Sequence, residues 1–213
     1  MRVLLLMTLV LLCFAASCTQ DAAWTVEPPR GDRLGAVARA INLTVEAQEA
    51  AAQKAIEALA AAGVTQGDAG DILAGARREV QRLRTRAQLA GRRLEHSRLT
   101  GDLLFEQWGE EIGTYSDGAL AKEASRQRSL VRTRFDAAIE ALDHADEAFN
   151  PILRLLDDRL LSLQHAIAAN VEPPAPLWTE VIAGDLLART HAARDVCDEF
   201  VKQVPEASRP ARR

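Results

Sequence analysis

Aromatic residues and cysteines are scarce in this chain of 213 residues. Aromatics make up 4% of it, and of the three cysteines Cys13 and Cys18 lie near the start, so only Cys197 remains for the rest of the chain. If Cys13 is removed with a leader and Cys18 carries an anchor, no internal disulfide is possible. An exported protein of this size must then be held by its apolar core. The 48% hydrophobic content, much of it alanine, predicts closely packed helices.

An excess of positive charge is also lacking. Lys and Arg number 26 against 30 Asp and Glu, for a net charge of -4, which argues against nucleic-acid binding. The one long apolar run, residues 3–14, is shorter than the ~20 residues that a membrane-spanning helix needs. A retained membrane helix is therefore not expected.

The start of the chain has the pattern of an export signal. Arg2 precedes the apolar run, and small residues at 15–17 come directly before Cys18. This order predicts a signal peptide over residues 1–17. The small residues before a cysteine resemble the lipobox of bacterial lipoproteins, with ordinary secretory cleavage nearby as the alternative.

Lipidation at Cys18 would place the protein at a membrane through its lipid anchor. The resemblance implies a thioether-linked diacylglycerol and an acylated amine, palmitate for example, and two or more acyl chains make anchoring stable. The expected location is the bacterial cell envelope, facing the periplasm. Thr19 in the next position favours the outer membrane over the inner one.

The rest of the chain divides into a tether at residues 18–33, a helical domain at 34–204 and a basic flexible tail at 205–213. Apolar residues at steps of three and four predict helices over residues 34–62, 71–113 and 178–200, and a third helix, before the last, that begins near residue 118. The third has the spacing of a coiled-coil seam. Pro151 should bend it or break it in two. No strand is expected.

The second and third helices are expected to pair as a hairpin about the turn at residues 114–117. Antiparallel pairing brings Phe105 opposite Val131 and Gly101 opposite Phe135. An arginine-rich stripe on the second helix could bind lipid phosphate or other polyanions. Flanking salt bridges are the preferred interpretation. The expected pairs are Arg98 with Asp136, Arg93 with Glu140, Arg92 with Asp143, Arg86 with Glu147 and Arg77 with Asp157.

The first helix is expected to cover residues 71–99 of the second, and the last to cover residues 143–169 of the third. The predicted fold is an all-α antiparallel helical bundle with a long central coiled-coil hairpin projecting beyond it. A hairpin of residues 100–134 that projects in this way should contact another copy of the chain or a periplasmic protein partner.

One segment resembles a known family. Leu104, Phe105, Trp108, Glu111 and Tyr115-Ser116 fit a recurrent pattern Leu-Phe-x-x-Trp-x-x-Glu-x-x-x-Tyr-Ser, and Arg132-x-Arg134-Phe135 and Asn150-Pro151-Ile152-Leu153 add to it. With these motifs the chain is similar to the bacterial lipoproteins of the domain-of-unknown-function family DUF2959. The resemblance implies an all-helical, lipidated envelope protein and supplies no catalytic residues.

No catalytic, cofactor-binding or metal-binding residues are assigned from the sequence. The function expected is that of a non-enzymatic envelope lipoprotein, a structural or adaptor module. The alternative is a ligand- or metal-binding periplasmic bundle that uses His144, His165 or His191 with nearby acids. Cys197 is expected to be a packed small side chain. The candidate partner contacts lie near the turn of the hairpin: Trp108, Glu110, Glu111, Tyr115, Ser116 and Asp117.

Overall fold

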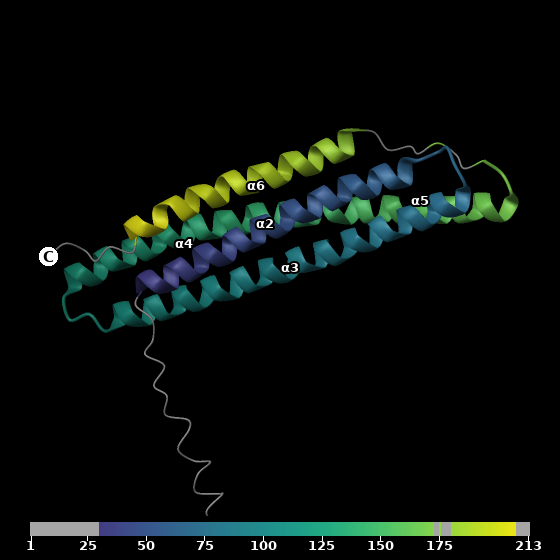
Figure 1. Cartoon of the computed structure of the whole chain (residues 1–213). Helices are drawn as coiled ribbons and strands as arrows, with labels where there is room; N and C mark the ends of the chain where they lie inside the picture. The colour runs from purple at the N-terminus through teal and green to yellow at the C-terminus, as the bar shows by residue number, and fades with distance from the viewer. Residues whose placement is uncertain (1–29, 173–174, 176–179, 208–213) are drawn as a thin grey trace, which may run out of the picture.

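The computed structural model describes residues 30–172, 175 and 180–207, and within these ranges it contains helices and no strand. The helices run along a common long axis (Figure 1), which confirms the all-α antiparallel bundle. Residues 1–17, Cys18 and Trp178 lie outside the described residues. In chain order the helices are α2 (Arg30–Gly63), α3 (Ala69–Gly113), α4 (Gly118–Glu147), α5 (Phe149–Ala169) and α6 (Glu180–Ala207).

Side-chain caps begin the two helices of the central hairpin. Asp68 accepts a hydrogen bond from the backbone N–H of Asp71 at 3.0 Å, and Asp117 accepts one from Ala119 at 2.8 Å. Each bond satisfies an amide that has no partner inside its helix. The outer helices are longer than predicted, because α2 already begins at Arg30 and α6 continues to Ala207.

Pro151 breaks the predicted third helix into α4 and α5. A proline ring clashes with the carbonyl four residues earlier and cannot donate to it. That carbonyl belongs to Glu147, where α4 ends. Pro151 then falls in the first turn of α5, where an N–H would have no partner within the helix in any case. Since α5 continues beyond α4 along the same axis, the two helices act as one interrupted rod (Figure 1).

The core runs along the bundle as two clusters of different character. The cluster nearer the α3–α4 turn is rich in large side chains, among them Leu34, Phe105 and Trp108, each at most 1% exposed. In the second cluster, α2 contributes mainly alanines, such as Ala51, Ala55 and Ala58. Small side chains let α2 approach α3 closely, while dense packing is kept by larger residues on the facing helices.

The predicted register of the α3–α4 hairpin is confirmed at its tightest point. A Cβ added to Gly101 would overlap the ring of Phe135, so the aromatic ring lies directly against the α3 backbone. The Phe135 ring is also 5.5 Å from that of Phe105 and 6.0 Å from that of Phe200, between ring centroids. A glycine is therefore required where α3 passes this aromatic cluster.

The hairpin of residues 100–134 does not project alone, so this part of the predicted architecture is wrong. On one side Arg33 of α2 donates to Gln107 of α3 at 3.1 Å, and on the other Phe200 of α6 packs on Phe135. Both outer helices are shifted toward the α3–α4 turn. The connection at residues 64–68 permits this shift, because five residues can span up to about 16 Å instead of forming a tight turn.

The same shift leaves the opposite end of the bundle with fewer helices. Arg159 of α5 donates through Nε to the carbonyl of Ala62 at 3.0 Å, in the last turn of α2. Beyond this point residues 160–169 of α5 continue for about 15 Å, beside the first turns of α3 (Figure 1). We call this part the α3–α5 end. Leu163 is buried there, but Leu161 is 50% exposed.

None of the helices in the described part of the chain combines the length and the apolar character that crossing a membrane requires.

Replacing Gly101 with alanine should test the close approach of α3 and α4. We expect Gly101→Ala to destabilise the protein by ~1–3 kcal/mol, because the methyl group must displace a ring that is packed on all sides. Chemical denaturation followed by circular dichroism measures this change. Gly184→Ala is the matched control: a Cβ there meets nothing within 4 Å, and alanine in an open helix position should stabilise by ~0.5–1 kcal/mol. Equal effects at the two positions would contradict the tight register.

Candidate functional site

The segment at the end of α3 places its aromatic and acidic residues on the side that faces α2. Trp108 is completely buried, and its ring lies 6.3 Å from that of Phe105, between centroids. Glu111 lies one turn further, and Tyr115 follows directly after the helix end. The spacing of three and four residues puts Trp108, Glu111 and Tyr115 in one row.

Arg30, at the first turn of α2, contacts all three members of this row. Its guanidinium lies 4.8 Å from the centroid of the Trp108 ring, in the position of a cation–π contact. One nitrogen donates to the Tyr115 hydroxyl at 3.1 Å and also pairs with Glu111. Arg33 stands 3.7 Å from the second carboxylate oxygen of Glu111. We call the set Arg30, Trp108, Glu111 and Tyr115 the Arg30 latch, since it fixes the start of α2 to the α3–α4 turn.

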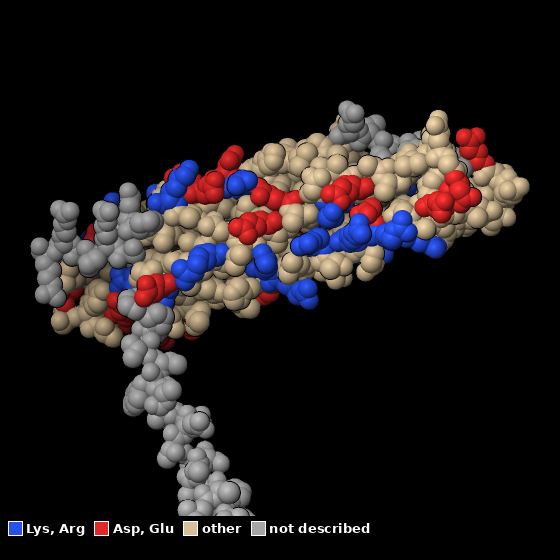
Figure 2. Space-filling model, in the orientation of Figure 1, with Lys and Arg blue, Asp and Glu red and all other residues tan. Residues whose placement is uncertain are grey.

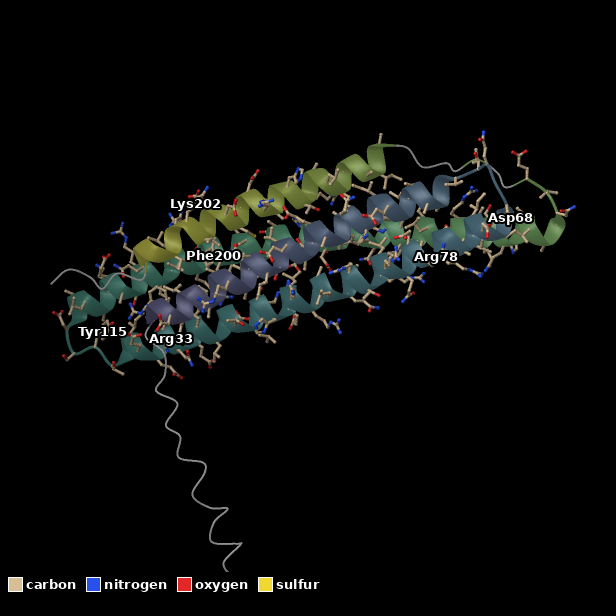
Figure 3. The ribbon with its side chains drawn as sticks, viewed as in Figure 1. Arg33, Asp68, Arg78, Tyr115, Phe200 and Lys202 are labelled. Atoms are coloured by element: carbon tan, nitrogen blue, oxygen red, sulfur yellow. The ribbon has the colours of Figure 1, made fainter. Side chains whose placement is uncertain are left out.

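The electrostatics of the latch favour the charged form of Arg30. Burial by itself lowers the pKa of Arg30, but hydrogen bonds to Glu111 and Tyr115 outweigh burial, and the pKa is raised above its usual value. Tyr115 also donates to Glu111 at 3.3 Å. Arg33 and Tyr115 come from different elements and meet at the same end of the bundle (Figure 3). The latch is suited to a structural role, because the Glu111 carboxylate interacts with two arginines and one hydroxyl group.

The six predicted partner contacts therefore fall into two groups. Trp108, Glu111 and Tyr115 make contacts within the protein. Glu110, Ser116 and Asp117 are exposed near the turn, and Asp117 also caps α4. The structure brings the first three together, and partner contact by the exposed three stays a prediction.

Sequence reasoning missed Arg30, which it placed in the tether because Pro28, Pro29 and Gly31 surround it. A signal was present: Arg30 and Arg33 precede the apolar residues Leu34 and Val37 at helical spacing. Extending the helix backward by one turn would have put both arginines at its start.

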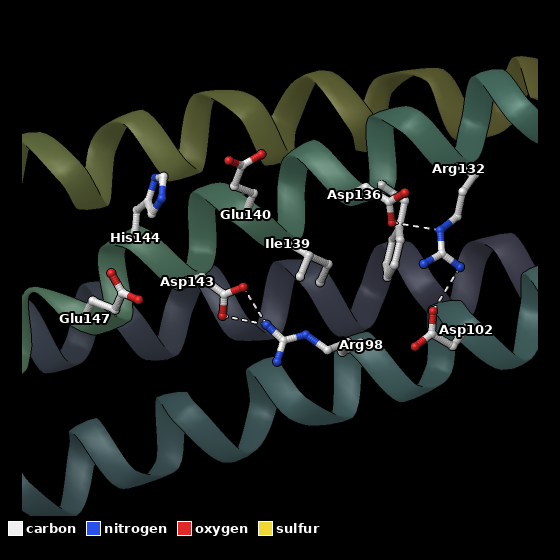
Figure 4. Close-up of a pocket in the computed structure, with 10 residues that line it drawn as sticks. Arg98, Asp102, Arg132, Asp136, Ile139, Glu140, Asp143, His144 and Glu147 are labelled. Atoms are coloured by element: carbon white, nitrogen blue, oxygen red, sulfur yellow. Dashed lines mark hydrogen bonds and ion pairs between the residues drawn. The ribbon is translucent and has the colours of Figure 1, made fainter.

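Arginine pairs between α3 and the α4–α5 rod occur, but not with the predicted partners. Arg98 binds Asp143, with one contact at 2.6 Å, instead of Asp136 (Figure 4), and Asp157 pairs with Arg84 instead of Arg77. Both changes have one cause. Helical side chains lean toward the N-terminus of their own helix. On two antiparallel helices, long side chains therefore meet when both residues lie further along the chain than a pair of residues whose backbones face each other.

The remaining predicted pairs do not form. Arg93 donates instead to the carbonyl of Leu43 on α2 at 2.7 Å. Within the described residues, neither Arg86 nor Arg92 has a carboxylate at ion-pair distance, so their predicted pairing with Glu147 and Asp143 is wrong. Arg93 thus turns toward α2, while Arg86 and Arg92 are exposed beside it.

A groove of about 580 Å³ lies between α3 and α4, and Figure 4 shows the charged residues along it. Arg132 bridges Asp102 at 2.9 Å and Asp136 at 2.7 Å. Acidic residues outnumber the basic ones along this groove. Three of its carboxylates, those of Asp102, Asp136 and Asp143, are paired with arginines. His144 belongs to its lining, with Glu140 and Glu147.

The histidines proposed for the alternative function do not converge. His144, His165 and His191 are all exposed, on α4, α5 and α6 respectively. In the described ranges, no group of three or more His, Cys, Asp or Glu side chains could hold a metal ion.

One half-buried and one fully buried titratable group lie away from the latch. Burial raises the pKa of the Asp146 carboxyl, and the charges of Asp143 and Glu147 raise it further. Cys197 is fully buried, with its sulfur 4.0 Å from the carbonyl of Ala138, which confirms the predicted packed thiol. Burial and Asp198 raise the pKa of Cys197 to about 12, so the thiol remains protonated and unreactive near neutral pH.

The latch can be tested through the fluorescence of Trp108. In a background of Trp24→Phe and Trp178→Phe, Trp108 is the one remaining tryptophan. We expect Arg30→Ala to increase quenching of Trp108 by acrylamide, because removing the guanidinium opens the ring to solvent. Arg39→Ala, at an exposed arginine of the same helix, is the matched control and should leave quenching unchanged. If both variants were quenched like the parent, Arg30 would not cover the ring.

Comparison with known proteins identifies one family. The family described as "Protein of unknown function (DUF2959)" matches residues 32–183, which include most of α2, all of α3, α4 and α5, and the row of Trp108, Glu111 and Tyr115. No curated protein and no solved structure matches the chain. Because the match covers well over half of its length, the chain belongs to the DUF2959 family.

Proposed function

We propose that this protein is a non-enzymatic lipoprotein of the cell envelope that serves as a rigid structural or adaptor module. In this proposal it contacts a periplasmic protein partner, or a second copy of itself, through the α3–α5 end. The observation that carries the proposal is the difference between the two ends of the bundle: the Arg30 latch closes one end, and two helices run on beyond the others at the opposite end.

Two apolar clusters, one after the other along the bundle, support the mechanical part of the proposal. The two clusters extend from Trp108 and Phe200 near the turn to Leu163 at the opposite end. Interiors packed at this density transmit force and displacement instead of absorbing them. A module of this kind can hold two attachment points at a fixed separation.

The position of α2 supports an anchor at the latched end. A lipidated Cys18 would lie within about 40 Å of Arg30 even with the intervening chain fully extended. The latch would then transmit the pull of the anchor directly to the hairpin turn. The α3–α5 end, at the other extreme of the rod, would remain available for a periplasmic partner.

Exposed apolar side chains support contact at the α3–α5 end. Leu161 is 50% exposed and Ile167 38%, and Val171 just beyond α5 is 58% exposed. The sequence-based proposal placed the contact at the hairpin turn. There α2 and α6 cover much of the surface, and three of the six candidate residues are occupied internally.

Lipidation is tested by Cys18→Ser in bacterial cells that produce the full chain. We expect the parent protein to remain with outer-membrane fractions washed in high salt and the variant to be released from them, because its thioether anchor cannot form and salt weakens contacts with charged headgroups. Cys197→Ser serves as the control, since Cys197 is buried and should not affect fractionation. Equal membrane association of Cys18→Ser and the parent would contradict the anchor.

Partner contact is tested by photo-crosslinking residues introduced at three exposed positions: Leu161 in the α3–α5 end, Ser116 in the α3–α4 turn and Ala192 on the side of α6. We expect a discrete adduct, with another protein or with a second copy, from Leu161 alone. Adducts from Ser116 but not Leu161 would move the contact to the turn and overturn the assignment. The same adducts from all three positions would show no specific contact.

A further inference from the structure

A basic groove of about 470 Å³ lies between α2 and α3 on one side of the bundle. Lys54 of α2 and Arg82, Arg86 and Arg92 of α3 line it, with Leu89 between the arginines. No acidic side chain belongs to the lining. We call this feature the basic groove.

The charges of this groove are only partly neutralised. Lys54 pairs with Glu57, and Arg82 pairs with Glu79, each within its own helix. Arg86 and Arg92 are exposed and have no ion-pair partner in the described part of the chain. The opposite side of α3 differs, because Arg84 and Arg98 there are bound by carboxylates of α5 and α4. Acids of the neighbouring helices thus pair with the inner arginines of α3 and not with Arg86 or Arg92.

The groove is part of a longer basic row. Arg78, Arg82, Arg86 and Arg93 follow at steps of four, four and seven residues, so they lie along one side of α3. The row extends for roughly 22 Å. Figure 2 shows Lys and Arg side chains gathered in such a row along the part of the surface formed by α2 and α3.

Two exposed leucines lie on α3 next to this row, nearer the turn. Leu99 is 59% exposed and Leu103 55%, among the more exposed large apolar residues described. They follow Arg92 at steps of seven and four residues, so the leucines share the side of α3 that carries Arg92, next to the basic row. Cationic and apolar side chains combined on one helix face are typical of surfaces that bind at the membrane interface.

We infer that the basic groove and its adjoining leucines bind the phosphate groups of anionic lipid headgroups, so that α3 lies along a membrane surface. Guanidinium groups match phosphate oxygens in charge and in hydrogen-bond geometry. Leu99 and Leu103 would enter the boundary between headgroups and acyl chains. This inference goes beyond the proposed function, since it needs neither lipid on Cys18 nor a protein partner.

The extent of the surface favours lipid over a single small anion. A phosphate ion would occupy one or two arginines, whereas the row is long enough to meet several headgroups, and Arg78, Arg82 and Arg86 in it are exposed. The leucines would add nothing to the binding of free phosphate. A second copy of the chain could offer the acidic α3–α4 groove to the same arginines, and the experiment below separates these cases.

The test uses sedimentation of the full chain with vesicles of phosphatidylcholine alone or mixed with phosphatidylglycerol. The apolar leader contributes to both mixtures, so the difference between them reports the anionic lipid. We expect tighter binding to the mixed vesicles, weakening as salt is added. The triple variant Arg82→Gln, Arg86→Gln and Arg92→Gln should lose on the order of 100-fold of this binding, about fivefold per charge.

A matched variant removes the same number of charges from the other helices: Lys122→Gln, Arg126→Gln and Lys202→Gln. These exposed residues belong to α4 and α6, and Lys202 lies on the far side of the bundle from α3 (Figure 3). It should bind mixed vesicles within about twofold of the parent. Circular dichroism should show the same helix content in all three proteins.

Three results would overturn the inference. One is equal binding of the parent to both kinds of vesicle. Another is the same loss in both triple variants, which would reflect net charge alone. In the third, the groove variant binds vesicles as tightly as the parent but has lost orthophosphate binding, or has lost self-association measured by sedimentation velocity. That outcome would assign the groove to free phosphate or to a second copy instead of lipid.

Discussion

The close contact of α3 with α4 at Gly101 fixes where the other helices can lie. The ring of Phe135 rests against the α3 backbone and at the same time touches Phe105 and Phe200, so one side chain joins three helices. The two helices have little freedom to slide, because moving α4 by one turn would press the Phe135 ring against an α3 residue that has a Cβ. The α3–α4 hairpin is therefore the frame on which α2 and α6 are placed.

The stagger of the outer helices follows from this frame and determines the two ends. Because α2 and α6 are both shifted toward the turn, Arg30 can reach Trp108, Glu111 and Tyr115, and residues 160–169 extend beyond the end of α2. One displacement thus produces both the latched end and the α3–α5 end. Arg82, Arg86 and Arg92 lie within the stretch of α3 that runs beside α2, where Lys54 of α2 lines the same groove.

The parts predicted from sequence are those fixed by local chemistry. Helical periodicity, the Asp117 cap, the interruption near Pro151 and the facing of Gly101 and Phe135 depend on nearby residues or on one short turn. The stagger of α2 was not predictable in this way, because a connection of five residues can be tight or extended, and the apolar pattern of an alanine-rich helix fits more than one register. The pairing of Arg98 depended on the lean of its side chain, which backbone register alone does not describe.

The arginine stripe shows how one pattern can have two physical meanings. Sequence reasoning treated the stripe as a unit and assigned it to salt bridges with the third helix. A helix with arginines on several sides cannot present all of them to one neighbour, and the structure divides them: Arg84 and Arg98 meet carboxylates, while Arg86 and Arg92 face outward beside α2. Arginines paired with carboxylates fix the register of the helices and present little net charge to a partner. The outward arginines keep a positive electrostatic potential around them. The chain as a whole has a net charge of -4, so this positive potential is confined to one face of the bundle. An anchored bundle would therefore turn that face, and not its acidic α3–α4 groove, toward an anionic surface.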